Sequence, residues 1–150
     1  MLGQRQIKLT PEFDVLLYDS DQRWDLHIRE VFRHLAEVKR RLERRLLICH
    51  VDLADKKTLR SAKFLLIPSP SRDSFRHALE AFQRQMPIVV HRSAWELKEL
   101  CVSSSAGLFY AEPEELRECL ELLLSNESLR RAMGVKGEEF VALYGGACLA

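Results

Sequence analysis

Short apolar runs alternate along the chain with longer segments in which apolar residues recur at helical spacing. The runs are rich in Val, Ile and Leu, and they occupy residues 13–18, 46–51, 63–67, 87–91 and 107–110. Near-continuous runs of this kind are typical of strands that are covered on both faces. Alternation of such strands with helices predicts βαβ units. We therefore expect residues 1–150 to form one Rossmann-like domain, a three-layer α/β/α sandwich whose mainly parallel sheet has about five strands.

Several of the intervening segments also carry signals for where a helix begins or ends. Helices are expected over residues 22–45, 53–62, 74–85, 93–102, 114–124, 127–133 and 137–144. Ser93 and Glu96 have the spacing of a capping box, and Pro113 suits a first helical position. Asn126 is a suitable N-cap. Gly134 is expected to end the helix that Asn126 begins.

Composition narrows the class of protein. The chain is 47% hydrophobic and 30% charged, which fits a globular domain better than a disordered or membrane-embedded one. Its 23 Lys and Arg residues nearly balance its 22 Asp and Glu residues, so no overall field favours nucleic acid. No apolar run is long enough for a membrane span or the core of a signal peptide. We expect a cytoplasmic protein with no nucleic-acid partner.

The residues that usually hold cofactors or metals do not form diagnostic patterns. The four cysteines, Cys49, Cys101, Cys119 and Cys148, are widely separated, which favours reduced thiols. None of the five histidines has a metal-ligand spacing to another ligand residue. Glycine-rich phosphate loops and nucleophile elbows are also missing. The sequence therefore predicts no cofactor, no metal and no catalytic residue.

Candidate binding residues gather where the expected strands end, because open α/β sheets bind ligands beyond the carboxyl ends of their strands. Polar segments follow four strands, at residues 19–21, 68–73, 92–93 and 111–113. The second is the richest, since hydroxyls and an acid precede a helix whose amides favour anions. Its candidates for substrate binding are Ser69, Ser71, Asp73, Ser74 and Glu80. The same residues also suit a turn followed by an N-cap, and both interpretations stay open.

Residues 61–144 carry a resemblance to a known family. The matching segments are SAKFLLIPS, ALEAFQRQMPIVV and a closing stretch that includes GLFYAEPEEL and LRRAMGVKGEEF. In this order they resemble the C-terminal, nucleotide-sugar-binding half of retaining glycosyltransferases with the GT-B fold, the glycosyl transferases of group 1. The resemblance implies a nucleotide sugar as ligand. In that family the later of two acids contacts the ribose of the nucleotide, and it corresponds to Glu80, seven residues before Pro87.

Other positions depart from the family pattern and indicate a degenerate site. Arg72 stands eight residues before Glu80, where the family has its earlier acid, and Asp73 fits only with a one-residue deletion. Ser74 and Arg76 replace the glycines of the family's loop, and Gln85 replaces the glycine before the last strand of that segment, so all three are expected to obstruct a diphosphate. Asp19 and Asp21 stand where the family places cations that neutralise the diphosphate, with Arg23 as the only cation nearby in the sequence. Negative charge there opposes departure of the diphosphate.

Members of the family also have a second, acceptor-binding half, which implies that this chain transfers no sugar by itself. The implied partners are a separate acceptor-domain protein or a second copy of the chain. The terminal helix would supply the surface for either partner. Its candidate residues are Phe140, Val141, Leu143 and Tyr144.

A pseudo-receiver is the alternative, as a regulatory or protein-interaction domain with a flavodoxin-like fold. Receiver domains also have five parallel strands and acids after the first strand, as in the segment YDSDQ here. They need an Asp after the third strand and a Lys after the fifth, where this chain has Pro68 and Ala111. Strand order 2-1-3-4-5 with a single closing helix would favour this alternative.

Overall fold

The structure is a computed structural model, and it describes residues 13–17, 26–41, 48–50, 62–68 and 74–145. Along the chain its elements are β1 (Phe13–Leu17), α2 (Leu26–Arg41), β2 (Ile48–His50), β3 (Ala62–Ile67), α4 (Ser74–Gln83), β4 (Ile88–His91), α5 (Trp95–Ser104), β5 (Gly107–Tyr110), α6 (Pro113–Ser125), α7 (Glu127–Phe140) and the π-helical turn η2 (Val141–Gly145). Among these helices, none is long and apolar enough to cross a membrane.

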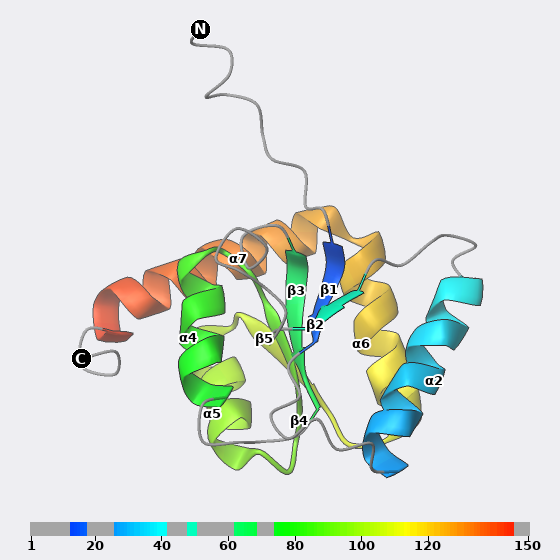
Figure 1. Ribbon diagram of the computed structural model, residues 1–150. Coiled ribbons are helices and arrows are strands. Elements are labelled where there is room, and N and C mark those ends of the chain that lie inside the picture. The colour runs from blue at the N-terminus through cyan, green and yellow to red at the C-terminus, as the bar shows by residue number, and fades with distance from the viewer. Residues whose placement is uncertain (1–12, 18–25, 42–47, 51–61, 69–73, 146–150) are drawn as a thin grey trace, which may run out of the picture.

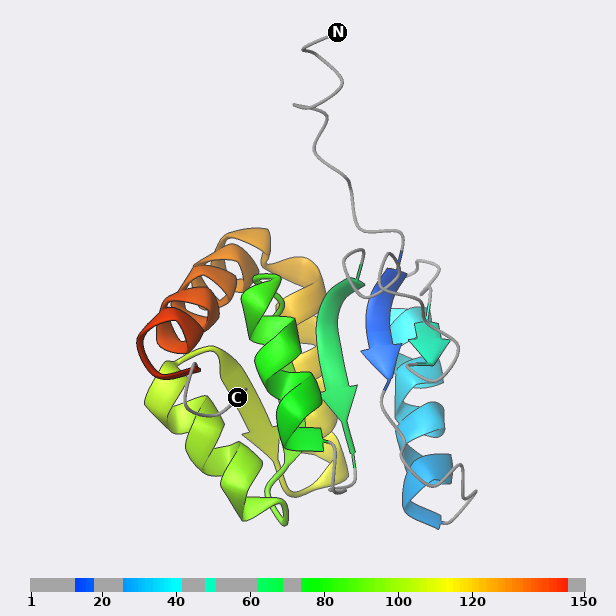
Figure 2. The ribbon, with the colours of Figure 1, turned by 60° about the vertical axis from the view of Figure 1, so that its left-hand side comes forward.

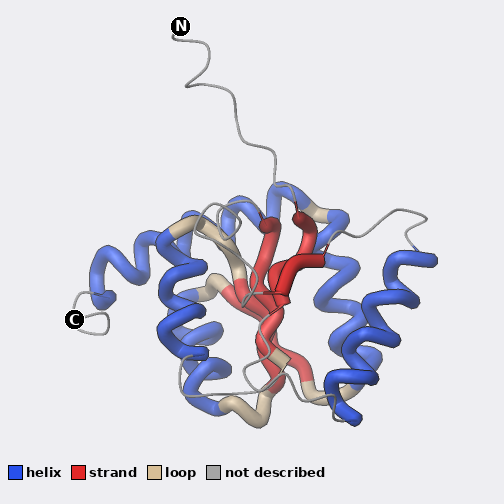
Figure 3. The backbone as a smooth tube through the Cα atoms, viewed as in Figure 1, coloured by secondary structure: helices blue, strands red, loops and turns tan. Residues whose placement is uncertain are grey.

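The strands form one parallel sheet in the order β2-β1-β3-β4-β5. Figure 3 shows the strands side by side at the centre with helices on either side. The predicted fold class, an α/β sandwich around a parallel sheet, is confirmed. All five strands lie within one or two residues of the apolar runs that predicted them.

Helices cover both faces of the sheet. In Figure 1, α2 and α6 lie on one side of it and α4 and α5 on the other. The turned view in Figure 2 keeps the same two layers. Helix α7 then passes along the end of the sheet at which the strands begin, and it packs against α4, α5 and α6. The opposite end, where the strands finish, holds the loops and the first turns of α2, α4, α5 and α6.

The sandwich has two apolar cores because successive strand residues point to opposite faces. In β3, Leu65 and Ile67 join the core beneath α4 and α5, whereas Phe64 and Leu66 join the core beneath α2 and α6. The first core also contains Phe82 from α4. All five of these side chains are buried, as expected for a strand and helix at the centre of three layers.

Helix ends follow the sequence signals in two places. The Asn126 side chain accepts the Leu129 N–H at 3.0 Å, and Pro113 is the first residue of α6, both as predicted. The predicted Ser93 capping box is wrong. Ser93 Oγ lies 2.7 Å from His91 Nδ1, and Ala94, which has no capping side chain, precedes α5 instead.

Two further expectations fail at α7 and β3. Gly134 does not end a helix, since α7 continues through it to Phe140. A Cβ at this position would overlap the backbone of Gln85, so the glycine allows close packing there. The helix expected over 53–62 is wrong at Ala62, which opens β3, and its other residues lie outside the described part of the chain.

Strand order alone does not separate the two proposed relationships. The observed order is the one expected for a receiver domain. A doubly wound sheet of order 3-2-1-4-5-6 that lacks its strand 3 has the same order once its strands are renumbered. The closing helices do differ from the receiver pattern, because α6 on one face is followed by α7, which packs on the helices of the other.

Candidate functional site

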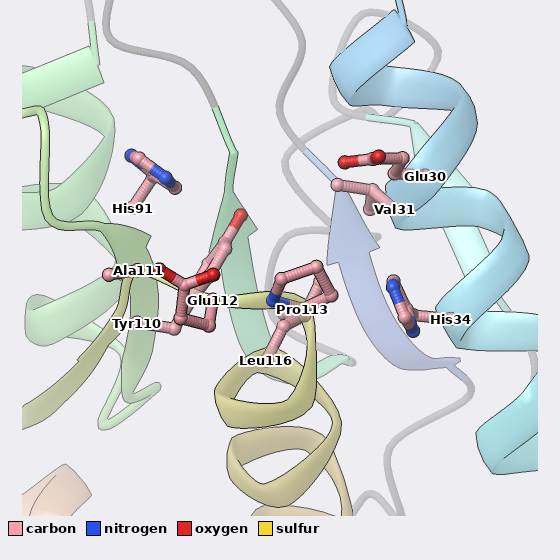
Figure 4. Close-up of a pocket in the computed structure, with 9 residues that line it drawn as sticks. All are labelled: Glu30, Val31, His34, His91, Tyr110, Ala111, Glu112, Pro113 and Leu116. Carbon is pink, nitrogen blue, oxygen red and sulfur yellow. The ribbon is translucent and has the colours of Figure 1, made fainter.

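A pocket lies at the carboxyl ends of β4 and β5, on the face of the sheet that α2 and α6 cover. Its volume is about 390 Å³. Figure 4 shows its lining, in which α2 faces the loop that joins β5 to α6 across an open space. The lining residues are Glu30, Val31, His34, His91, Tyr110, Ala111, Glu112, Pro113 and Leu116. The position agrees with the rule that open α/β sheets bind ligands where their strands end.

The β5–α6 loop is held by the first turn of α6. Glu115 Oε1 accepts the N–H groups of Glu112 at 2.9 Å and Ala111 at 3.3 Å. Pro113 follows as the first helical residue, where its fixed φ favours the helix and no N–H is required. The pocket wall formed by this loop is therefore fixed by hydrogen bonds within the loop and the helix.

Two buried polar side chains in the lining lack hydrogen-bond partners. His34 is 7% exposed and Tyr110 is 2% exposed. Both ring nitrogens of His34 and the Tyr110 hydroxyl are without a hydrogen bond. Glu37 Oε2 lies 3.8 Å from His34 Nδ1, which is beyond hydrogen-bond distance. Buried polar groups are nearly always paired, so two orphans on one pocket call for an explanation.

His91 orients the Tyr110 ring from the end of β4. The two rings meet edge to face, with centroids 5.1 Å apart. The Ser93 backbone N–H donates to His91 Nδ1 at 3.1 Å, which makes that nitrogen an acceptor in the neutral ring. Burial, with a smaller contribution from Cys119, raises the pKa of the Tyr110 hydroxyl far above its usual value, so the phenol stays protonated. The pocket thus presents a neutral hydroxyl that can donate or accept.

The charged groups around the pocket are acidic. Glu30 and Glu112 contribute carboxylates, whereas no Lys or Arg is among the described residues that line it. In Figure 4 the Glu30 carboxylate extends from α2 toward the strand ends. Within the described ranges, no group of three or more potential ligand residues is placed to hold a metal ion. The lining therefore suits a neutral or cationic polar molecule better than a phosphate.

The predicted binding residues lie around the start of α4, on the other face of the sheet. Ser74 is buried as the first residue of α4, and Glu80 is half-buried further along it. Glu80 Oε2 lies 3.6 Å from His77 Nδ1, one turn earlier. Ser69, Ser71 and Asp73 lie outside the described residues. Neither Ser74 nor Glu80 lines the pocket.

Comparison with known proteins supports the glycosyltransferase relationship. No protein-family model matches it. An uncharacterized glycosyltransferase of Methanocaldococcus jannaschii is 28% identical over 102 residues, 62% of this chain and 29% of that protein. The crystal structure of WaaG, a glycosyltransferase involved in lipopolysaccharide biosynthesis, matches 94% of this chain and 46% of its own with a TM-score of 0.66 at 14% identity. The chain is glycosyltransferase-like.

The resemblance inferred from the sequence is thereby confirmed. This glycosyltransferase-like chain spans less than half the length of either protein it matches. The similarity to WaaG, at this low identity, concerns the fold.

Gln85, which replaces a glycine of the family pattern, does not lie at the strand ends of this glycosyltransferase-like domain. Gln85 lies in the turn between α4 and β4, at the end of the sheet where the strands begin. The expectation that it obstructs a diphosphate at the strand ends is wrong for that reason. Its φ of 57° retains the left-handed conformation that a glycine would adopt.

Sequence reasoning missed the two residues that mark the pocket. His34 lies on the apolar side of α2 and has no metal-ligand spacing that would mark it, and Tyr110 closes an apolar strand. The segment 111–113 was noted as a polar strand end and does line the pocket. Only the position of α2 relative to β5 brings these groups together.

Proposed function

We propose that this chain is a nucleotide-sugar-binding domain of the glycosyltransferase type. The observation that supports this most is that α4, which carries the family-like Glu80, begins with Ser74 directly beyond the carboxyl end of β3. The first amides of a helix lack intrahelical partners and favour phosphate oxygens. The glycosyltransferase likeness gives this arrangement a ligand class that a helix start alone would not have.

The proposed donor site comprises Ser69, Ser71, Asp73, Ser74 and Glu80. In this proposal the hydroxyls and the α4 amides bind the diphosphate, and Glu80 accepts hydrogen bonds from the ribose. Glu80 is suited to that role because it is only half-buried and its close neighbour, His77, lies at the long distance of 3.6 Å. A ribose hydroxyl would form a shorter hydrogen bond with the same carboxylate.

Sugar transfer, in this proposal, requires a second acceptor-binding unit, in the same polypeptide, in another one or in a second copy. Transfer depends on holding donor and acceptor with their reacting atoms aligned, which can contribute ~7–11 kcal/mol of the barrier. Asp19 and Asp21 also stand where the family places cations, so we expect nucleotide binding with little turnover. The expected cytoplasmic location stays a prediction.

Only two of the four terminal residues proposed to contact such a unit are exposed. Val141 is buried and Phe140 packs against the core beneath α4 and α5, so neither is available. Leu143 is 74% exposed and Tyr144 is 59% exposed. These two side chains at the end of η2 are the ones that we propose a partner covers.

Titration with uridine and guanosine diphosphate, followed by amide chemical shifts, tests the donor site. We expect shifts at residues 74–80, and a weaker response in Glu80→Gln than in Glu118→Gln, an exposed acid on α6. Shifts confined to other parts of the protein would contradict the placement. Nucleotide release from labelled nucleotide sugars well above the rate without protein, lost in Glu80→Gln, would instead contradict the lack of turnover.

A pseudo-receiver function is kept as a second candidate because the strand order is that of receivers. Pro68 after β3 and Ala111 after β5 replace the phosphorylated Asp and the Lys of that class. This candidate predicts a protein partner and no response to either nucleotide. The same titration therefore separates the two functions.

A further inference from the structure

The pocket beside α2 has features that the proposed donor site does not explain. We call it the His34–Tyr110 pocket, after the two orphaned side chains in its lining. It opens on the α2 and α6 face of the sheet, whereas the proposed donor residues Ser74 and Glu80 belong to α4 on the other face. The two sites therefore lie on different faces of the sheet.

The orphaned groups indicate what kind of polar atom would fit. A neutral imidazole has one nitrogen that donates and one that accepts, and a phenol hydroxyl can do both. In Figure 4 the Tyr110 hydroxyl points into the space between the strand ends and α2, and His34 borders that space. A hydroxyl group on a ligand can donate to one of these side chains and accept from the other. The pocket thus offers complementary partners for a hydroxyl-bearing molecule.

The charges indicate the sign of the ligand. Glu30 and Glu112 line the pocket, and no cationic side chain among the described residues lines it with them. Glu37, the next acid on α2, is engaged by Arg117 at 3.3 Å and Arg40 at 3.7 Å, so those two cations are neutralised outside the lining. Among the described lining residues, a phosphate would meet two carboxylates and no counter-charge. An ammonium group would meet two acceptors of opposite charge.

We propose that the His34–Tyr110 pocket binds a small hydroxyl-bearing organic cation. A volume of about 390 Å³ lies in the range of small-molecule sites. The lining combines two carboxylates, Glu30 and Glu112, with apolar side chains such as Val31 and Leu116. The ammonium group lies between Glu30 and Glu112, and a hydroxyl reaches Tyr110 and His34. This site goes beyond the proposed nucleotide-sugar function, and neither depends on the other.

Three probes that share one ring and differ in charge test the proposal on the whole chain. They are glucosamine at neutral pH, where most of its amine is protonated, glucose, and glucose 1-phosphate. We expect amide shifts at residues 30–34, 91, 110–112 and 114–116. The affinity should fall from glucosamine to glucose to glucose 1-phosphate. Equal affinity for the three, tighter binding of glucose 1-phosphate, or no shifts at these amides would overturn the proposal.

Substitutions separate the charge from the hydrogen bonds. Glu30→Gln should weaken glucosamine binding about threefold, since Glu30 is exposed and its charge is screened, and should leave glucose unchanged. Tyr110→Phe should weaken both about tenfold, because it removes a buried hydrogen bond. Glu114→Gln, an exposed acid on α6 outside the lining, is the matched control and should change neither. Losses of equal size in all three variants would refute the assignment.

The outcome of the glucosamine titration does not depend on whether the proposed donor site binds a nucleotide. Uridine and guanosine diphosphate report on residues 74–80, and glucosamine reports on the pocket lining. Failure of the nucleotide titration leaves the glucosamine experiment fully interpretable, and the reverse also holds.

Discussion

The α-carbon of Gly134 lies directly against the backbone carbonyl of Gln85, so that a Cβ at position 134 would overlap the carbonyl oxygen. This approach brings the middle of α7 onto the turn between α4 and β4. Gly137, one turn later, is similarly close to the Phe82 ring, with 2.9 Å between its ideal Cβ and the ring. Both glycines are buried inside a helix, where their role is close packing rather than termination.

We predict that Gly134→Ala destabilises the protein. In an exposed helix this substitution would stabilise by about 1 kcal/mol through helix propensity. Here the added methyl must displace backbone, and overpacking of this kind costs ~1–3 kcal/mol. Denaturant unfolding should show a net loss, and Ala132→Gly at an exposed position of α7 calibrates the propensity. Stabilisation by Gly134→Ala would mean that α7 does not contact Gln85.

Gln85→Gly should stabilise the protein for a related reason. Gln85 and Ser105 are the two non-glycine residues with positive φ in the described chain, both at 57°. A left-handed residue with a Cβ costs ~1–2 kcal/mol, and the greater freedom of glycine in the unfolded state returns part of it. We expect a gain of about 0.5–1 kcal/mol from Gln85→Gly and from Ser105→Gly.

Glu118→Gly provides the contrast, because Glu118 lies in the interior of α6. It should lose about 1 kcal/mol by the same denaturant measurement. A loss of similar size at Gln85 would show that its hydrogen bond to Glu138, 3.1 Å long and exposed, outweighs the backbone strain.

The fold could be predicted largely because its signals are local. Buried strands need continuous apolar runs, and Asn126 and Pro113 act within one helical turn of where they stand. Predictions failed where a distant or competing partner decided the outcome. Ser93 is next to a helix start but contacts His91, and Gly134 is retained for a contact with Gln85, which is far away in sequence.

The site was less predictable because it depends on packing across the sheet. The residues 111–113 could be selected as a strand end, since parallel strands finish at one edge. His34 could not, because its importance comes from α2 lying across the pocket from the loop that joins β5 to α6. A histidine on the buried side of a helix gives no sequence signal that it lacks a hydrogen-bond partner.

The buried thiols predict a specific loss of stability in alkali. Burial, with a smaller contribution from Cys119, raises the pKa of Cys101 from 9.0 to about 12. Burial and the nearby Glu115 and Glu118 raise that of Cys119 to about 11. Above pH 9 the unfolded chain loses these protons while the folded chain keeps them. The folded state then binds more protons, so the free energy of unfolding falls as pH rises toward the folded pKa values.

Between neutral and alkaline pH, the free energy of unfolding should therefore decline less in Cys101→Ala than in the wild type. The variant is expected to be less stable than the wild type at neutral pH. Alkylation by iodoacetamide at mildly alkaline pH, followed residue by residue with mass spectrometry, should be slow at Cys101 and Cys119 in the folded protein, since the thiolate is the reactive form. Rapid native-state labelling of Cys101 would show that its thiol is accessible and that the raised pKa is wrong.

Tyr110→Phe should have opposite effects on stability and on binding. The Tyr110 hydroxyl is buried without a partner, and leaving such a group unpaired costs ~1–3 kcal/mol. Removing it keeps the ring against His91 and should raise the free energy of unfolding by about 1 kcal/mol, whereas Tyr144→Phe, at an exposed position, should change it by less than ~0.5 kcal/mol. With saturating glucosamine, the wild type should become more stable than Tyr110→Phe. A ligand that binds the folded wild type more tightly also stabilises it more. If Tyr110→Phe destabilises the protein without ligand, the hydroxyl has a partner in the folded state and is not free to bind one.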